Sequence, residues 1–378
     1  MKYLHIIQEL SIFAVKMYKR PKIMVKKLLF IISLCGFSYY FAYAVDFEHN
    51  SFRDGDLVLQ REVITDSLYD LRNASFSDDT FVDFYQQQGD TITRYFQNAQ
   101  YHYLQSDNNL SFIGSENRQL TMMNSVPEIL LRFPIIESPA VYGVLERFGK
   151  YCEHVFIKAN GNYESSYQGE IVLHVSESDS ISGVKHFVTS RYYTVSDDNV
   201  NQQSSNRQNT INLSERYDRL YADGCRYPVI ERRIVKLTDN PSVVIYDKTF
   251  YCSPEIQSQY LNDDANAAQS ERNNYSLDKS SNTGKNWTNN TDDISDYISN
   301  DIDLQQLRLE YDSDVNTQGW LVLADSSGKV LKTVNFNGKG KETVKVNLNY
   351  SGYGIKPLVL YVNINSKKYS YSFYSSRP

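Results

Sequence analysis

The sequence predicts an all-β or β-rich protein with an antiparallel β-sandwich-like N-terminal domain and a small C-terminal β-sandwich. Apolar and β-branched residues recur in short runs that turn residues separate, without helical periodicity between them. The chain also contains 31 tyrosines, a residue whose ring packs well on a pleated surface while its hydroxyl reaches water. A length of 378 residues favours two domains.

The N-terminus has the pattern of an export signal. Lys26 and Lys27 precede the apolar run 28–37, which is too short for a comfortable membrane span. The small residues Ala42 and Ala44 then form an A-x-A site, and polarity rises directly afterwards. We therefore expect cleavage after Ala44.

Residues 1–44 are accordingly interpreted as a signal peptide, with residues 1–23 upstream of the true start. An uncleaved anchor, or a lipoprotein attached through Cys35, remains an alternative. No later run approaches the roughly 20 apolar residues of a transmembrane helix, so no membrane span is expected after cleavage. The expected location is the periplasm, the cell surface or the medium, with the export machinery as a partner.

Residues 45–260 are expected to form the β-rich domain. The clearest strands are 151–159, 170–175, 184–195 and 229–237, and turn residues separate the first three. Strands at this spacing favour an antiparallel sheet or sandwich.

Residues 261–300 are rich in Asn, Asp, Ser and Thr and predict a disordered polar linker. Residues 301–378 return to a strand pattern, with a turn at 325–328 and a hairpin signal at Asn337-Gly338. About seven short strands are expected there, enough for a small sandwich.

The C-terminal region resembles the sorting domain of type IX (Por) secretion substrates. The resemblance lies in 322–330, in Gly352-Tyr353 and in Lys367-Lys368 on the last strand. It implies an immunoglobulin-like sandwich, outer-membrane export and surface attachment. The proline-containing motif that usually opens this domain has no counterpart in 298–307.

The first domain has a fainter resemblance to circularly permuted papain-like amidases. It lies in 54–58, 154–157 and 251–253. It implies a catalytic His154 at the head of a strand and a Cys252 nucleophile, which would need the imidazole within hydrogen-bond reach. The long gap between the first two motifs departs from the family pattern.

Composition argues against nucleic-acid binding. The net charge is −6 and the isoelectric point near 5.6, whereas a nucleic-acid binder needs a concentrated basic face. The pair Arg232-Arg233 is interpreted as a solvated strand edge. The histidines show no metal-binding spacing, so neither a metal site nor a cofactor is predicted.

Cys225 and Cys252 flank a predicted hairpin whose turn is 238–241. If they lie nearly opposite each other across the ladder, their Cα atoms come within disulfide reach. We therefore hypothesise a Cys225–Cys252 bond, which leaves Cys152 unpaired. A buried Cys252 thiol and a catalytic one remain alternatives.

Aromatic and charged residues concentrate in Tyr217, Tyr221, Arg226 and Tyr227. If exposed, such a group can stack on sugar rings and bond to their hydroxyls. A purely structural stacking at a sheet corner is the alternative. A glycan or another surface component is therefore a candidate partner.

The leading interpretation is a secreted or cell-surface, non-catalytic protein with a binding or surface-structural role. The alternative is a secreted hydrolase. It would be either a cysteine amidase or peptidase using Cys252 and His154, or a polysaccharide hydrolase using a carboxylate pair that sequence alone does not locate.

Overall fold

The computed structural model describes residues 45–106, 108–134, 139–152, 155–197, 210–261, 263–267, 298–301, 306–347, 357–364 and 367–374. Contacts divide the chain at Ala44–Val45, and all described residues belong to the second part. The predicted signal peptide with Ala42 and Ala44, the candidate base His154 and the linker residues 268–297 lie outside the described residues.

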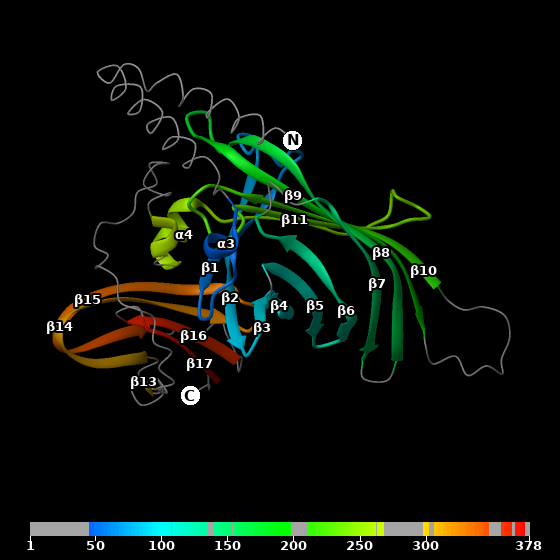
Figure 1. Cartoon of the computed structure of the whole chain (residues 1–378). Coiled ribbons are helices and arrows are strands. Elements are labelled where there is room, and N and C mark those ends of the chain that lie inside the picture. Colours follow the sequence, from blue (N-terminus) through cyan, green and yellow to red (C-terminus); the bar gives the residue numbers. More distant parts are fainter. Residues whose placement is uncertain are drawn as a thin grey trace, which may run out of the picture. The chain divides into compact units, whose positions relative to one another are not determined.

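Twelve of the described strands form a closed antiparallel barrel in which each strand pairs with its neighbours along the chain and β12 pairs with β1 (Figure 1). The strands are β1 (Leu57–Ile64), β2 (Ser75–Gln88), β3 (Thr91–Phe96), β4 (Ala99–Ser106), β5 (Asn109–Asn117), β6 (Leu120–Arg132), β7 (Val141–Tyr151), β8 (Val155–His174), β9 (Ser180–Asp197), β10 (Thr210–Tyr221), β11 (Ile230–Leu237) and β12 (Val244–Tyr251). The β-rich prediction is thus confirmed.

The sandwich-like arrangement expected for residues 45–260 is replaced by this barrel. Closure occurs where Arg61 of β1 pairs with Tyr251 of β12, and Glu62 with Phe250. A sandwich leaves sheet edges unpaired, whereas closure satisfies the backbone groups of both terminal strands. The expected strands 184–195 and 229–237 correspond to β9 and β11.

Alternation along each strand decides what faces the barrel interior. One close approach is made possible by glycine: a Cβ on Gly143 would lie 2.3 Å from the ring of Tyr163. Without that Cβ, the buried Tyr163 side chain fits against β7, and its hydroxyl accepts a hydrogen bond from the backbone N–H of Ile129.

A hydrophobic cluster fills one part of the barrel interior. The segment around helix α3 (Phe47–Asn50) contributes Phe52, whose ring lies 4.9 Å from Tyr85, 5.1 Å from Tyr103 and 5.6 Å from Tyr227. Asp46 caps α3 by accepting from the backbone N–H of His49. The chain preceding β1 therefore packs inside the barrel that it begins.

The C-terminal strands form a five-stranded sheet in the described residues, with the order β13 (Ile298–Asp301), β14 (Gln306–Asp325), β16 (Pro357–Ile364), β17 (Lys367–Tyr374) and with β15 (Val330–Asn347) paired to β14. It has its own core, which includes Leu321, Leu360 and Phe373. The structure has fewer and longer strands there than the seven short ones expected, because β14 and β15 each span two of the predicted strands.

The predicted turn at 325–328 is confirmed by a backbone bond of 2.9 Å from the Gly328 N–H to the Asp325 carbonyl. Asn337 and Gly338, by contrast, do not form a hairpin turn. They lie within β15 and pair with Gln318 and Thr317 of β14.

The start of the predicted linker is ordered. Helix α4 (Pro254–Leu261) ends at the buried Leu261, and Asp263 accepts two bonds from the Arg226 guanidinium. This short stretch is ordered despite its polar composition, because it is buried against the barrel.

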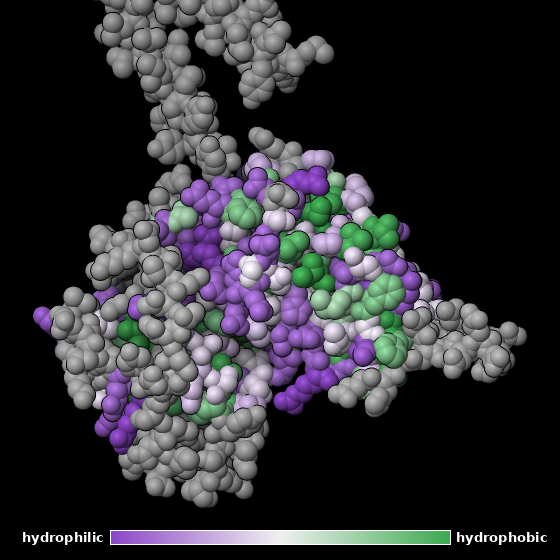
Figure 2. Space-filling view, turned by 60° about the horizontal axis from the view of Figure 1, so that its bottom comes forward, coloured by the Kyte–Doolittle hydropathy of each residue, from purple (hydrophilic) through white to green (hydrophobic). Residues whose placement is uncertain are grey.

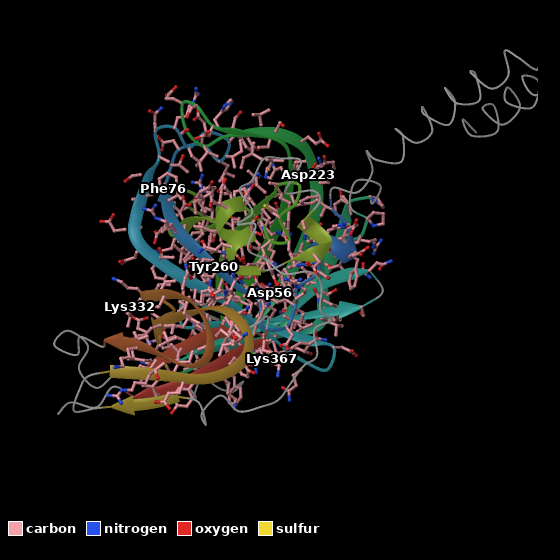
Figure 3. All side chains as sticks on the ribbon, turned by 90° about the vertical axis from the view of Figure 1, so that its left-hand side faces the viewer. Asp56, Phe76, Asp223, Tyr260, Lys332 and Lys367 are labelled. Atoms are coloured by element: carbon pink, nitrogen blue, oxygen red, sulfur yellow. The ribbon has the colours of Figure 1, made fainter. Side chains whose placement is uncertain are left out.

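The C-terminal sheet packs on the outer face of β1 and β2. Leu57, Leu59 and Val82 of the barrel cluster with Trp320 and Val322 of β14. The backbone N–H of Val82 also donates to the Gly328 carbonyl at 2.7 Å. Figure 3 shows Tyr260 of α4 close to this contact.

A buried ionic cluster joins the same two parts. The fully buried Asp56 accepts from the ammonium of Lys368 on β17, from the Arg53 guanidinium and from the Tyr227 hydroxyl. Gly55 lies against the Lys368 side chain, where an added Cβ would be 3.0 Å from the Lys368 Cδ.

Hydrophobic residues gather on part of the surface beside hydrophilic ones (Figure 2). On the outer face of β7 and β8, the exposed Phe148 and Phe156 lie under the ammonium groups of Lys158 and Lys150, at 4.7 and 5.0 Å. These lysines keep that face solvated. Within the described residues, no helix combines the length and apolar character needed to cross a membrane.

Candidate functional site

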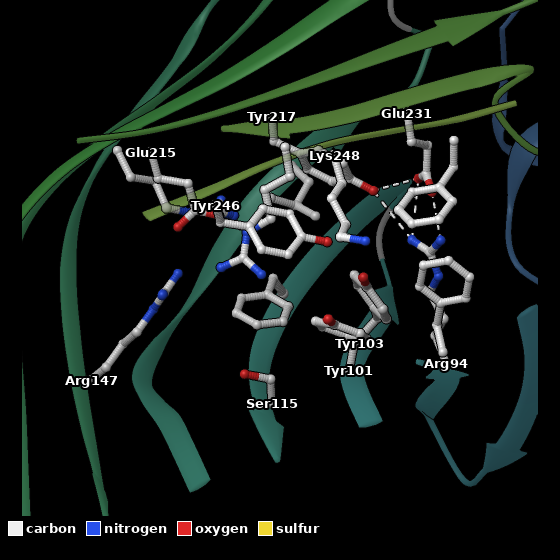
Figure 4. Close-up of a pocket in the computed structure, with 16 residues that line it drawn as sticks. Arg94, Tyr101, Tyr103, Ser115, Arg147, Glu215, Tyr217, Glu231, Tyr246 and Lys248 are labelled. Atoms are coloured by element: carbon white, nitrogen blue, oxygen red, sulfur yellow. Dashed lines mark hydrogen bonds and ion pairs between the residues drawn. The ribbon is translucent and has the colours of Figure 1, made fainter. Parts of the chain in front are cut away.

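A cavity of about 80 Å³, measured as the space open to the centres of water molecules, lies inside the barrel and is partly open to solvent. Side chains from β10, β11 and β12 face side chains from β3, β4, β5 and β7 across it (Figure 4). Its lining consists of Arg94, Phe96, Tyr101, Tyr103, Phe112, Ser115, Leu130, Arg147, Arg191, Glu215, Tyr217, Glu231, Arg233, Tyr246, Lys248 and Phe250.

At one end of the cavity, a single guanidinium lies between two carboxylates. Arg94 donates to Asp83 at 2.8 Å and to Glu231 at 2.5 and 3.2 Å. The Tyr217 hydroxyl also donates to Glu231. Figure 4 shows Arg94, Tyr217 and Glu231 converging from opposite walls.

At the other end, three guanidinium groups share two carboxylates. Glu128 accepts from Arg147 and from Arg191, each at 2.6 Å. Glu215 accepts from Arg191 at 3.0 Å and from Arg233 at 2.8 Å. This group of five residues is called the arginine cluster below.

Aromatic rings line the space between the two ends. Arg94 lies 5.1 Å from the ring centroid of Phe96, and Arg147 lies 5.3 Å from that of Phe112. Phe96 and Phe250 are in edge contact at 4.9 Å. The cavity therefore combines apolar walls with oriented cationic groups, which is typical of small-molecule sites.

Asp83 and Glu215, which lie near opposite ends of the cavity, have pKa values shifted in opposite directions. Burial raises the pKa of Asp83 to about 6 despite the nearby Arg94. Burial also disfavours ionised Glu215, but the charges of Arg233 and Arg191 outweigh it and lower the pKa of Glu215 to about 2. Glu215 is therefore ionised at neutral pH, whereas the pKa of Asp83 lies much closer to neutral pH.

Asp83 and Glu231 both accept hydrogen bonds from Arg94 and are therefore candidates for the carboxylate pair that a polysaccharide hydrolase needs. Asp83 accepts from Arg94, Gln60 and Tyr85, and it is not part of the cavity lining. Glu231 is held by Arg94 and Tyr217. A general acid must reach the scissile bond, and these groups are instead engaged with the barrel wall.

The aromatic cluster predicted from the sequence is not an exposed platform. Tyr221 and Tyr227 are 1% and 0% exposed and belong to the hydrophobic cluster inside the barrel. Arg226 is buried and bonded to Asp263 and to the Ser51 carbonyl. Of these four residues only Tyr217 lines the cavity, whereas Tyr221, on the same face of β10, packs in the hydrophobic cluster.

Cys252 lies in a setting that keeps its thiol protonated. It is 1% exposed, packs in the hydrophobic cluster, and burial raises its pKa well above the ordinary value. A nucleophilic cysteine needs the opposite shift. Its proposed partner His154 lies outside the described residues.

Cys225 and Cys252 are free thiols in the structure. The expectation that they face each other across the hairpin is wrong, because the β11–β12 ladder ends where Ile230 pairs with Tyr251. Cys225 precedes that ladder in the turn after β10, and the Cys252 N–H donates to the carbonyl of Val229 instead.

A histidine constellation lies outside the cavity. His186 Nε2 is 2.8 Å from Asp218, and His186 Nδ1 is 3.1 Å from the Tyr69 hydroxyl. Arg216 donates two bonds to the same Asp218. These contacts fasten the connection between β1 and β2 to the outside of the barrel wall.

Sequence reasoning missed most of the cavity lining. Arg233 was expected on a solvated edge together with Arg232, but Arg233 turns inward to Glu215 while Arg232 turns outward to Asp247. Along β10, the polar and aromatic residues Glu215, Tyr217 and Arg219 occupy alternate positions. This alternation was the sequence feature that could have indicated a polar face of the strand. A polar interior face can be recognised only once the barrel is known to be closed.

No family model, curated protein or solved structure matches the chain. The functional argument therefore depends on the cavity itself: its enclosure by the barrel, its aromatic walls and the arrangement of its charges.

Proposed function

We propose that this protein is an exported, non-catalytic binding protein that holds a small molecule inside its barrel. The observation that carries the proposal is the cavity within the closed barrel, lined by both aromatic and charged side chains. Barrels of moderate strand number commonly enclose ligand sites of this kind.

The polar groups of the cavity favour binding over catalysis. Glu215 accepts from Arg191, which Glu128 also holds, and Glu231 accepts from Arg94, which Asp83 also holds. Such groups are preorganised to orient a ligand, whereas a general acid or base must be available to exchange a proton with it.

The architecture supports the same conclusion. The hydrophobic cluster around Phe52 gives the barrel a packed core, so the cavity can remain unfilled without loss of the fold. The wall strands are long, and some are continuously paired, as in the ladder between β9 and β10. A rigid wall limits the entropy that is lost when a ligand binds.

The test is a fluorescence titration with N-phenyl-1-naphthylamine, a neutral aromatic probe that brightens in apolar surroundings. The mature chain from Val45 should show saturable binding with one site per chain. The substitution Ser115→Trp places a large side chain into the cavity lining and should reduce the affinity at least tenfold.

The matched control is Ser214→Trp. Ser214 precedes the inward-facing Glu215 on β10, so strand alternation turns its side chain away from the cavity. Ser214→Trp should bind the probe as the unmodified protein does. Equal binding by the Ser115→Trp protein would reject the cavity as the binding site.

A further inference from the structure

The charges inside the barrel do not balance. In the arginine cluster, Arg147, Arg191 and Arg233 share only Glu128 and Glu215. All three arginines line the cavity, but of the two acids only Glu215 does. The cluster therefore presents a net positive charge to the cavity.

A fourth cation lies in the wall beside this cluster. Arg219 is 3% exposed, and its guanidinium donates to the neutral oxygens of Thr189 and Leu130, at 2.8 and 3.5 Å. Its buried Nε has no hydrogen-bond partner. Glu231, which pairs with Arg219 across the ladder, is bonded instead to Arg94 and Tyr217.

Arg219 adjoins the cavity lining. Its guanidinium lies 5.0 Å from the centroid of the Tyr217 ring, and both Tyr217 and Leu130 line the cavity. Glu231 interacts with Arg219 electrostatically but is hydrogen-bonded to Arg94 and Tyr217, so the charge of Arg219 is only partly compensated. An anion that enters the cavity reduces the cost of burying this cation.

The opposite end of the cavity has an excess of carboxylates and lies apart from the arginine cluster (Figure 4). Arg94 is shared there by Asp83 and Glu231. Because burial raises the pKa of Asp83 to about 6, this acid carries less than a full negative charge at slightly acidic pH. Between the two ends stand aromatic residues, including Phe96, Phe112 and Phe250.

We infer that the ligand is an amphipathic organic anion whose headgroup pairs with the arginine cluster and whose apolar body lies against the aromatic walls. This inference rests on the proposed function. Guanidinium groups bind carboxylates and similar oxyanions through charge-assisted, often bidentate hydrogen bonds. The recognised class is therefore an aliphatic or aromatic acid with one anionic headgroup.

Arg233 is the best residue for a test, because its neighbour provides a matched control. Arg233 faces the cavity, with 37% of its side chain exposed, whereas Arg232 points outward to Asp247 with 19% exposed. Arg233→Met removes the excess charge of the cluster while Arg191 still pairs with Glu215. Arg232→Met removes the same charge from the other face.

The experiment compares two probes of similar aromatic size, the anionic 8-anilinonaphthalene-1-sulfonate and the neutral N-phenyl-1-naphthylamine. The unmodified protein should bind the anionic probe more tightly. Arg233→Met should lower its affinity for that probe about tenfold or more, the magnitude of one charge-assisted hydrogen bond. Binding of the neutral probe should fall much less than binding of the anionic probe, so that the ratio of the two affinities changes.

Arg232→Met should leave the affinity for both probes unchanged, and Arg233→Lys should restore much of the anion affinity because it keeps the charge. Near-ultraviolet circular dichroism and cooperative urea unfolding establish that each variant is folded. If Arg233→Met does not fold, Arg233→Gln takes its place, with the same expected loss of anion binding.

Competition then identifies the body of the ligand. Decanoate and 2-naphthoate are compared with decanol and 2-naphthol for displacement of the neutral probe. An advantage of decanoate over decanol indicates an aliphatic acid, and an advantage of 2-naphthoate over 2-naphthol an aromatic acid. Equal displacement by each acid and its alcohol would overturn the inference.

The outcomes separate the two proposals. If the neutral probe binds at a site that Ser115→Trp blocks but Arg233→Met does not affect the anionic probe, the anion inference is wrong and the binding function stands. If neither probe binds the folded protein, the binding function itself is rejected, and the ligand class with it.

Discussion

Arg232 and Arg233 show how much a single residue's role depends on the period of its strand. The two arginines are adjacent on β11, yet one pairs with Asp247 outside the barrel and the other with Glu215 inside it. The sequence indicates that adjacent strand residues point in opposite directions, but it does not indicate which of the two faces the barrel interior. That direction is set by the closure of the sheet, which depends on pairing between β1 and β12.

At the same scale, Glu215 should make stability depend on pH. Its pKa falls from 4.5 to about 2 on folding, because Arg233 and Arg191 outweigh the effect of burial. A lowered folded-state pKa stabilises the protein above the unfolded pKa, and this contribution is lost as pH falls from about 4.5 towards 2. The shift corresponds to roughly 3 kcal/mol.

Glu215→Gln should therefore lower the free energy of unfolding by up to about 3 kcal/mol at pH 7, and by much less near pH 2.5. Urea unfolding at a series of pH values measures the difference. Glu146→Gln is the control, since Glu146 forms a half-exposed pair with Lys158 and should have little effect. A Glu215→Gln difference that does not change with pH would contradict the assigned ion pairs.

At the scale of elements, the C-terminal sheet and the barrel share a buried ionic contact. Burial lowers the pKa of Lys368, and Asp56 opposes that effect. Lys368→Met leaves Asp56 with Arg53 and Tyr227 but removes the link to β17. We expect a loss of about 1–3 kcal/mol in the free energy of unfolding, as for a buried charged hydrogen bond.

The matched substitution is Lys367→Met, on the neighbouring and exposed residue of the same strand. Figure 3 shows Lys367 at the strand that approaches the Asp56 region. Chemical unfolding should detect a change of less than about 0.5 kcal/mol for this variant. Equal effects of the two methionine substitutions would mean that the buried contact does not join the sheet to the barrel.

Some turns and hairpins could be predicted from the residues that form them. The turn at 325–328 follows from its own residues, and the hairpin between β11 and β12 follows from the turn at 238–241. Asn337-Gly338 misled because β15 continues through that point and pairs with β14 on both sides of a register shift between Ser313 and Thr317. Long-range pairing on both sides overrides the local turn preference.

At the scale of the whole molecule, the sequence predicted β structure but not its closure. The pairing of Arg61 with Tyr251 joins residues far apart along the chain, and nothing local to either residue indicates it. The sequence left open whether Tyr221 and Tyr227 form an exposed binding surface or a structural stack, because Tyr is amphipathic. In a closed barrel the same residues pack inside, and the functional surface becomes an interior one.

A crystal structure of residues 45–378 with 6-bromo-2-naphthoate tests whether the barrel interior is the binding site. The anomalous signal of bromine locates the ligand without prior assumptions. We expect a bromine position among the aromatic residues of the cavity, with the carboxylate directed to Arg233. Saturable binding with bromine only on the outer surface of the barrel would contradict this expectation.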